Sequence, residues 1–220
     1  MNFIKNHSIE LVIFDMDGLM FDSERIYVET WPDAARLFGY EVTEEAVVGA
    51  IGLNAEAGRA HFEGLYGKAF PFYEIREARL KSATSLIEKK GLPIKQGLYN
   101  ILNVLKEKNI KKAIATSSER KRADWYLELS HLEGVFDAIV CGDEIENSKP
   151  NPEIFIKAAK KINTEPKHCI VLEDSESGIR AAHSAGMYPF MVPDYKQPSE
   201  ELKSLTAGIF KSLDAVADIL

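Results

Sequence analysis

Two aspartates stand close together directly after a short apolar run near the start of the chain. The run covers residues 11–14, and Asp15, Asp17 and Gly18 follow it in the order Asp-Met-Asp-Gly. The glycine allows the chain to turn sharply after the carboxylates. Taken alone, the pattern also fits a capping aspartate followed by a turn aspartate, so its chemistry depends on what else lies nearby.

A second acidic pair, Glu173 and Asp174, follows another apolar run at residues 170–172. If both runs are parallel strands, at least three carboxylates meet at one edge of a sheet, where they raise one another's pKa values. A bound cation relieves this repulsion, and oxygen ligands favour Mg²⁺ over zinc. The five histidines show no metal-ligand spacing. The sequence therefore predicts a Mg²⁺ site made of carboxylates.

Hydroxyl and basic side chains stand at the ends of other elements. Thr116, Ser117 and Ser118 lie where a strand is expected to end and a helix to begin, which makes a candidate phosphate site. Ser118 alone also fits the N-cap of that helix. Lys149 precedes a helix that Pro152 is expected to open. Alone it fits a surface lysine, but beside the carboxylates it becomes a candidate for stabilising a phosphoryl group.

The elements that must position these residues alternate between apolar runs and helical patterns. The apolar runs are typical of strands in a buried parallel sheet, and they cover residues 11–14, 113–115, 138–141, 170–172 and 188–192. The helical patterns of this part cover residues 97–108, 119–129, 152–161 and 175–185. The alternation predicts right-handed βαβ units and a doubly wound, Rossmann-like α/β core. Ligands bind such cores outside the carboxyl ends of the strands.

The stretch from residue 23 to residue 92 breaks the alternation because it shows helical patterns only. These patterns cover residues 23–38, 43–51, 55–66 and 71–90. A helical insert of this length is too long for a crossover connection. We therefore expect a discontinuous catalytic core, residues 1–22 and 93–220, with an inserted all-α cap domain, residues 23–92, that acts as a lid.

Composition and charge exclude several classes of protein. The chain has 220 residues, of which 45% are hydrophobic and 28% charged, and this excludes disordered and collagenous chains. The net charge is -7, so the chain lacks the excess of basic residues that is typical of proteins that bind nucleic acids. No apolar run approaches the ~20 residues of a membrane span, and no secretory signal is visible. We expect a cytoplasmic protein with a small-molecule substrate and free thiols at Cys141 and Cys169; the sequence leaves its oligomeric state open.

Together the motifs resemble those of the haloacid dehalogenase superfamily. They occur in the order of that family, and they are Asp15-x-Asp17-Gly18, Thr116-Ser117, Lys149-Pro150 and Glu173-Asp174-Ser175 with the segment from Gly178 to Met187. The helical insert resembles the cap of the branch that contains β-phosphoglucomutase and small-sugar phosphatases. The resemblance covers essentially the whole chain and implies a parallel sheet with an inserted helical cap.

The resemblance implies different roles for the paired aspartates. Asp15 would attack the substrate phosphorus and form an aspartyl-phosphate. Asp17 would protonate the leaving oxygen and then take a proton from the hydrolytic water. These two tasks need separated pKa values, which the metal and Lys149 could enforce. The second aspartate favours phosphoryl transfer over dehalogenation, because an ester leaving group needs an acid.

The resemblance also implies ligands for the metal and for the phosphate. Mg²⁺ would be held by Asp15, the backbone carbonyl of Asp17, and Asp174, with Glu173 in or near the same coordination shell. It would neutralise charge, so that an anionic nucleophile can approach an anionic phosphate. The side chain of Thr116, the amide of Ser117 and the ammonium of Lys149 would hold the phosphate oxygens.

The cap bears on whether the chain is a phosphatase or a mutase. The mutase branch uses a cap histidine and an arginine, whereas this chain has Tyr27 at the histidine position and Ala55 near the arginine position, with Arg59 as the nearest alternative. Trp31 does match a tryptophan of the family. These departures favour a Mg²⁺-dependent phosphatase for small phosphomonoesters, above all sugar phosphates, with a β-phosphoglucomutase-type mutase as the alternative. Further cap candidates for substrate contact are Glu24, Asn54 and Lys81.

Two alternatives come from other functional classes. A phospho-receiver signalling module also groups acidic residues, a hydroxyl and a lysine around Mg²⁺, but it lacks a helical insert and has no use for Asp17 as an acid. An inactive member of the family kept as a binding partner is the other alternative. Every motif residue is present in this chain, which disfavours it.

Overall fold

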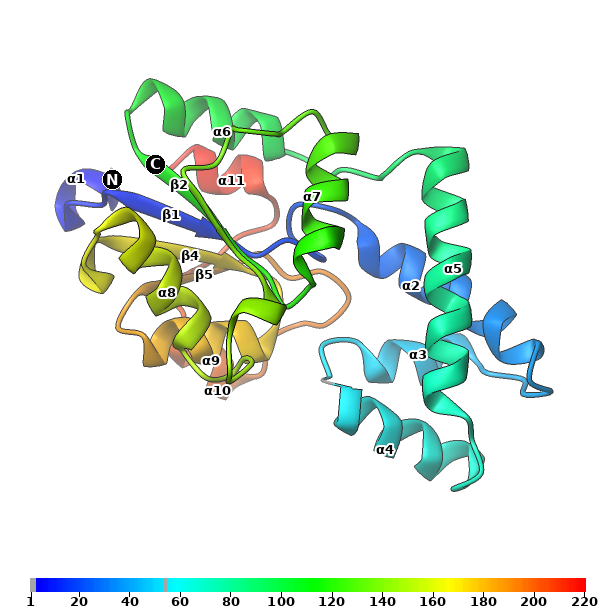
Figure 1. Ribbon diagram of the computed structural model, residues 1–220. Helices are drawn as coiled ribbons and strands as arrows, with labels where there is room; N and C mark the ends of the chain where they lie inside the picture. The colour runs from blue at the N-terminus through cyan, green and yellow to red at the C-terminus, as the bar shows by residue number, and fades with distance from the viewer. Residues whose placement is uncertain (1–2, 54) are drawn as a thin grey trace. The chain divides into compact units, whose positions relative to one another are not determined.

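The computed structural model of the protein describes residues 3–53 and 55–220. The chain forms two compact units, of which one comprises Met1–Phe21 and Ile94–Leu220 and the other Asp22–Pro93. The first is an α/β unit and the second contains helices only among its described residues (Figure 1). The helical unit is inserted in the chain between the first and second strands of the α/β unit.

A six-stranded parallel sheet forms the centre of the α/β unit. The strands are β1 (Leu11–Phe14), β2 (Lys111–Ala115), β3 (Ala138–Val140), β4 (Cys169–Glu173), β5 (Tyr188–Met191) and β6 (Gly208–Ile209). They lie in the order β3-β2-β1-β4-β5-β6, and each neighbouring pair is parallel. Leu11 of β1 is paired with Lys111 on one side and Cys169 on the other. The predicted doubly wound core is confirmed, and its strand order reverses beside β1, where such sheets bind ligands.

Helices cover both faces of this sheet, with α6 and α11 on one face and α8 and α9 on the other (Figure 1). The helices of the unit are α1 (Phe3–His7), α6 (Leu98–Glu107), α7 (Arg120–Leu129), α8 (Glu153–Ile162), α9 (Glu176–Ser184), α10 (Glu200–Leu205) and α11 (Leu213–Ala217). Short 3-10 helices cover Gly142–Glu144 and Pro166–His168. The two ends of the described chain lie side by side, since the Phe3 N–H donates to the Ile219 carbonyl at 3.3 Å.

Apolar packing fixes where the strands end. All residues of β1 and β4 are buried, which explains their unbroken apolar runs up to the acidic residues. Helix α8 turns a stripe of Ile154, Phe155, Ala158 and Ala159 towards the same core. Each large apolar side chain buried in this way contributes about 1.5–3 kcal/mol. The carboxyl ends of the strands are therefore held in fixed positions at one edge of the sheet.

The helical unit has an aromatic core of its own. Its helices are α2 (Ser23–Arg36), α3 (Glu44–Ala50), α4 (Ala55–Tyr66) and α5 (Phe72–Lys90). Phe62 is fully buried and stacks on Trp31 with ring centroids 4.8 Å apart and on Phe70 with centroids 5.4 Å apart. The Thr43 hydroxyl accepts the Ala46 N–H at 3.2 Å and so caps α3. The helices of the insert therefore pack around a hydrophobic core of their own.

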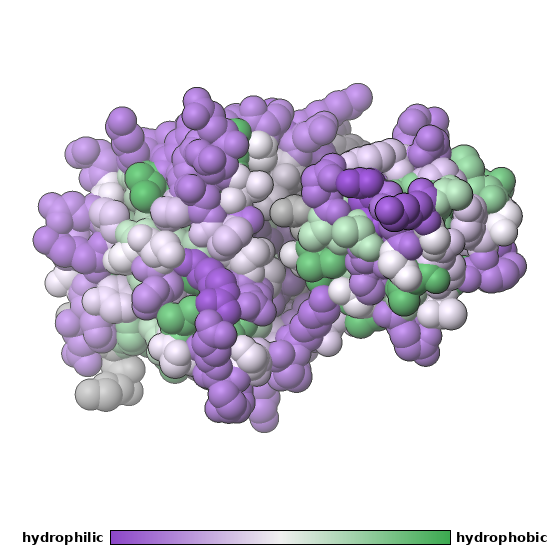
Figure 2. Space-filling model, turned by 90° about the horizontal axis from the view of Figure 1, so that it is seen from below, coloured by the Kyte–Doolittle hydropathy of each residue, from purple (hydrophilic) through white to green (hydrophobic). Residues whose placement is uncertain are grey.

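The surface is mainly hydrophilic on the face that Figure 2 shows, where hydrophobic side chains form small patches. Exposed large apolar side chains include Leu37 and Leu65 of the helical unit and Ile156 of the α/β unit. Scattered exposed apolar residues are ordinary for a folded domain. None of the helices in the described part of the chain combines the length and the apolar character that crossing a membrane requires.

Candidate active site

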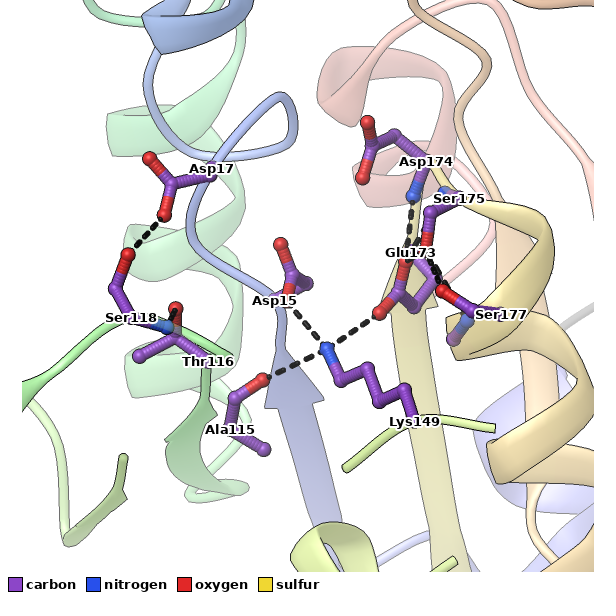
Figure 3. A network of polar contacts seen from close by, with 11 residues as sticks. Asp15, Asp17, Ala115, Thr116, Ser118, Lys149, Glu173, Asp174, Ser175 and Ser177 are labelled. Atoms are coloured by element: carbon purple, nitrogen blue, oxygen red, sulfur yellow. Dashed lines mark hydrogen bonds and ion pairs between the residues drawn. The ribbon is translucent and has the colours of Figure 1, made fainter. Parts of the chain in front are cut away.

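A buried lysine joins the acidic residues at the ends of the central strands (Figure 3). The Lys149 Nζ donates to Asp15 Oδ1 at 2.5 Å, to Glu173 Oε1 at 2.6 Å and to the Ala115 carbonyl at 3.1 Å. The exposed fraction of the side chain is 5% for Lys149, 10% for Asp15 and 0% for Glu173. The ends of β1, β2 and β4 therefore meet at one ammonium group.

Burial and neighbouring charges shift the pKa values of both Asp15 and Lys149. Burial raises the pKa of the Asp15 carboxyl above its usual range; the charge of Lys149 lowers it, and that of Glu173 raises it. Burial lowers the pKa of Lys149, but the charges of Asp15 and Glu173 outweigh this effect and raise it above its usual range. Lys149 is therefore an ammonium ion. Its single charge faces two buried carboxyl groups, so the site favours a further cation.

The chain around the end of β4 holds both oxygens of Glu173. While Oε1 accepts from Lys149, Oε2 accepts the backbone N–H groups of Asp174 at 3.1 Å and Ser175 at 3.0 Å. The Ser175 hydroxyl donates to the same oxygen at 2.8 Å and accepts the Gly178 N–H at 3.1 Å, which caps α9. A side chain at Gly178 would overlap the Glu173 carboxylate. Glu173 is thus fixed by its own loop and by Lys149.

Three acidic side chains come close enough to hold one metal ion. Carboxylate oxygens of Asp15, Glu173 and Asp174 lie within 4.8 Å of one another. Gly18 allows Asp174 to approach, because a Cβ at Gly18 would overlap its carboxylate; Gly18 also has a φ of +81°, which favours glycine. A donor set of oxygens only fits Mg²⁺ or Ca²⁺ better than zinc.

The carboxylate of Asp17 points away from this acidic cluster and towards the segment that leads into α7 (Figure 3). Its Oδ2 accepts the Ser118 hydroxyl at 2.7 Å, and its Oδ1 lies 3.4 Å from the Arg122 guanidinium. Among the described residues, the side chain of Asp17 does not belong to the group of three carboxylates. The two aspartates of the motif therefore lie in different surroundings.

The predicted hydroxyl residues lie at the end of β2. Thr116 is fully buried, its N–H donates to the Val140 carbonyl at 3.1 Å, and its Oγ1 accepts the Ser118 N–H at 3.0 Å. Ser117 is exposed between them. The turn thus presents one buried and one exposed hydroxyl residue at the edge of the sheet where Asp15 and Lys149 lie.

The N-cap interpretation of Ser118 is wrong. Helix α7 begins at Arg120 and has Glu119 at its N-cap position without a side-chain cap bond, while the Ser118 hydroxyl reaches Asp17 instead. Sequence reasoning also missed Arg122 beside Asp17. Ser118 was misinterpreted because a serine between a strand and a helix is typical of an N-cap. Arg122 was missed because a single arginine on a helix belongs to no motif. Only the fold brings Asp17 and Ser118 together across 101 positions of the chain.

Tyr27 lies inside the helical unit as a packing residue of α2. Its ring stacks on Trp31 with centroids 5.4 Å apart, and the Arg79 guanidinium lies 4.8 Å from its centroid. Burial raises the pKa of Tyr27 to about 12, although the charge of Arg79 lowers it. The phenol therefore does not titrate near physiological pH, whereas a histidine with an ordinary pKa does.

The other cap candidates have ordinary surroundings within the helical unit. Arg59 pairs with two glutamates of its own helix, and Lys81 pairs with a glutamate one turn away on α5. Glu24 lies in the first turn of α2. Asn54 falls outside the described residues. Substrate contacts for these positions remain predictions.

The chain is similar in sequence to known hydrolases and phosphatases. Residues 12–192 match the family model of the haloacid dehalogenase-like hydrolases. A phosphorylated carbohydrates phosphatase of Thermotoga maritima is 34% identical over 180 residues, which cover 81% of this chain and 82% of that protein. Hexitol phosphatase B of Escherichia coli is 27% identical over 188 residues, which cover 82% of each chain.

The structural comparison points to the same group of proteins. A crystal structure of β-phosphoglucomutase from Clostridium difficile superposes with a TM-score of 0.76 at 26% identity, covering 94% of this chain and 92% of that chain. The predicted resemblance to the branch with phosphatases and β-phosphoglucomutase is confirmed. Sequence, sheet topology and the motif residues around Lys149 agree: the chain belongs to the haloacid dehalogenase-like hydrolases.

Proposed function

We propose that the protein is a Mg²⁺-dependent phosphatase that hydrolyses small phosphomonoesters, above all sugar phosphates, through an aspartyl-phosphate. The observation that carries the proposal is the buried contact of Lys149 with both Asp15 and Glu173, beside the Asp174 carboxylate. The names of two relatives, a phosphatase of phosphorylated carbohydrates and a hexitol phosphatase, support the substrate class.

The residues fit a magnesium ion by their charge and donor atoms. Carboxylate oxygens of Asp15, Glu173 and Asp174 lie within 4.8 Å of one another, and the buried Lys149 ammonium contacts the first two of these residues. Asp15, the backbone carbonyl of Asp17, and Asp174 would hold the ion, with Glu173 beside them. When bound, Mg²⁺ supplies positive charge that lets an anionic carboxylate approach an anionic phosphate. Both oxygens of Glu173 already accept hydrogen bonds, so the main role of Glu173 is to hold Lys149 in place.

Asp15 acts as the nucleophile in this proposal. Lys149 holds its Oδ1, and the other carboxylate oxygen points away from the lysine (Figure 3). That oxygen attacks phosphorus, a new P–O bond forms to Asp15, and the P–O bond to the leaving alcohol breaks. Thr116, the Ser117 amide and Lys149 hold the phosphate oxygens, so that the charge which spreads over them is stabilised.

Asp17 moves the protons of both steps. It gives its proton to the leaving oxygen in the first step, so the alcohol departs neutral. Water then attacks the phosphorus of the aspartyl-phosphate while Asp17 takes a proton from it, the bond to Asp15 breaks and phosphate is released. Both aspartates return to their starting states. The two roles fall on carboxyl groups with different contacts, since Asp15 accepts from Lys149 whereas Asp17 accepts from Ser118 and lies beside Arg122.

A β-phosphoglucomutase-type activity is the second candidate, favoured by the likeness to a solved β-phosphoglucomutase. The surroundings of Tyr27 argue against it, since burial raises the pKa of this phenol to about 12. A group that shuttles protons works best with a pKa near the working pH, which a histidine has and this tyrosine lacks. We therefore favour hydrolysis, with the helical insert as a cap that excludes water and selects the substrate.

The test is a screen over small phosphomonoesters with Mg²⁺, which scores both phosphate release and conversion of β-glucose 1-phosphate to the 6-phosphate. We expect phosphate release that depends on Mg²⁺, disappears in Asp15→Asn and is not accompanied by isomerisation. Isomerisation with little free phosphate would instead support the mutase. Phosphate release that persists in Asp15→Asn, or in excess chelator, would refute the proposed nucleophile or the metal, respectively.

A further inference from the structure

We propose that Ser118 and Arg122 are positioning residues that hold the Asp17 carboxylate for its proton transfers. The proposal rests on the function above, in which Asp17 is the acid and base. Each residue takes one oxygen of this carboxylate: the Ser118 hydroxyl donates to Oδ2 at 2.7 Å, and the Arg122 guanidinium lies 3.4 Å from Oδ1. Two contacts on the two oxygens restrict rotation about the side-chain bonds of Asp17.

Ser118 is itself held on both sides by backbone contacts. Its N–H donates to Thr116 Oγ1 at 3.0 Å, and its carbonyl accepts the Gly142 N–H at 2.9 Å. A side chain at Gly142 would overlap the Ser117 carbonyl, so the glycine allows the two loops to approach. The backbone of Ser118, from which the hydroxyl reaches Asp17, is therefore held by residues that follow β2 and β3.

Arg122 is supported by a buried aromatic residue of its own helix. Its guanidinium donates to the Tyr126 hydroxyl at 2.8 Å and lies 5.1 Å from the centroid of that ring. Tyr126 is 1% exposed and packs edge-on against Phe21 at 5.4 Å. The backbones of Phe21 and Asp17 form an isolated β-bridge. Arg122 is therefore connected to Asp17 a second way, through Tyr126 and Phe21.

This arrangement has a consequence for the rate of the first step. A carboxyl group held near one geometry meets the leaving oxygen more often than one that samples several rotamers, and a misplacement of about 1 Å costs up to about 100-fold in rate. The loss depends on the leaving group. An alkyl alcohol needs a proton when it departs, whereas p-nitrophenolate, a weak base, does not.

The experiment compares kcat/KM for an alkyl phosphate with kcat/KM for p-nitrophenyl phosphate, because this ratio reports steps only up to release of the alcohol. The variants are Ser118→Ala and Arg122→Ala, with Asp17→Asn as the reference for loss of the acid. Arg180→Ala is the matched control, since Arg180 pairs with a glutamate on α9 and is 33% exposed against 31% for Arg122. Thermal unfolding of each variant checks that it is folded.

We expect each positioning variant to lose about 10- to 100-fold with the alkyl ester and less than about 3-fold with the p-nitrophenyl ester. Neither substitution should lower kcat/KM further when it is added to Asp17→Asn, and Arg180→Ala should resemble the wild type. An equal loss on both esters, or a full additional loss in the Asp17→Asn background, would overturn the proposal. If Asp17→Asn itself affects both esters equally, the assigned role of Asp17 fails instead.

Discussion

Replacing Lys149 with methionine removes the charge that joins two buried carboxyl groups. The Nζ lies 2.5 Å from Asp15 and 2.6 Å from Glu173, and the lysine side chain is 5% exposed. Methionine fills most of the same volume, so little of the effect comes from a cavity. Breaking a buried pair by removing one partner costs about 3–5 kcal/mol, because a charge stays buried without compensation. We expect the free energy of unfolding of the α/β unit to fall by this amount.

Urea unfolding followed by circular dichroism measures the loss, with a chelator present so that a metal cannot replace the missing charge. A slope of about 2 kcal/mol per M converts the expected loss into a midpoint lower by about 1.5–2.5 M. Adding Glu173→Gln to Lys149→Met should restore part of the stability, because a neutral amide replaces one of the two carboxylates.

Lys111→Met is the matched control for this experiment. Lys111 pairs with Asp137 at 3.1 Å, but its side chain is 59% exposed, so its loss should cost no more than about 1 kcal/mol. If Lys149→Met costs no more than Lys111→Met, the reasoning about buried charge is refuted. A double variant less stable than Lys149→Met alone would refute it as well.

Three other changes have distinct expected outcomes. In Gly178→Ala, the new methyl group displaces the Glu173 carboxylate, so turnover should fall at least about tenfold, which a steady-state assay measures. Burial raises the pKa of Cys141 to about 11 and that of Cys169 to about 12, so neither thiol should react with a disulfide reagent at pH 8 until urea unfolds the protein. Rapid reaction of the native protein would contradict this. Phe62→Ala empties the centre of the aromatic core and should destabilise the helical unit by about 3–5 kcal/mol in urea unfolding; an unchanged midpoint would contradict the packing.

The sequence predicted the centre of the sheet well because β1 and β4 are buried at every residue. Apolar runs such as residues 11–14 leave little choice other than a central parallel strand, and the acidic residues after them mark where the strand ends. Short elements at the edges were missed. The strand β6, Gly208–Ile209, and the helix α11, Leu213–Ala217, are too short for a hydrophobic period to be visible.

The candidate site was predictable only as a set of residues, not as a set of contacts. Residue types after strands indicated that the acidic residues gather at one edge; Lys149 was expected before a helix and had a candidate role only if it lay beside them, and it does contact Asp15. That Glu173 has both oxygens occupied depends on how the turn at Ser175 folds back on it, a contact that the order of residues in the motif does not state. The contact of Ser118 with Asp17 was hidden in the same way, because a hydroxyl before a helix resembles a cap.

The most direct test of the central claim is to detect the phosphoryl group on Asp15 during turnover. The wild-type enzyme is mixed with a sugar phosphate and Mg²⁺, quenched in acid and reduced with borohydride, which converts an aspartyl-phosphate to homoserine, and its peptides are sequenced by mass spectrometry. We predict homoserine at position 15, none at Asp17, and none when substrate is omitted. Turnover without any modification at Asp15, or with the modification at another residue, would contradict the account.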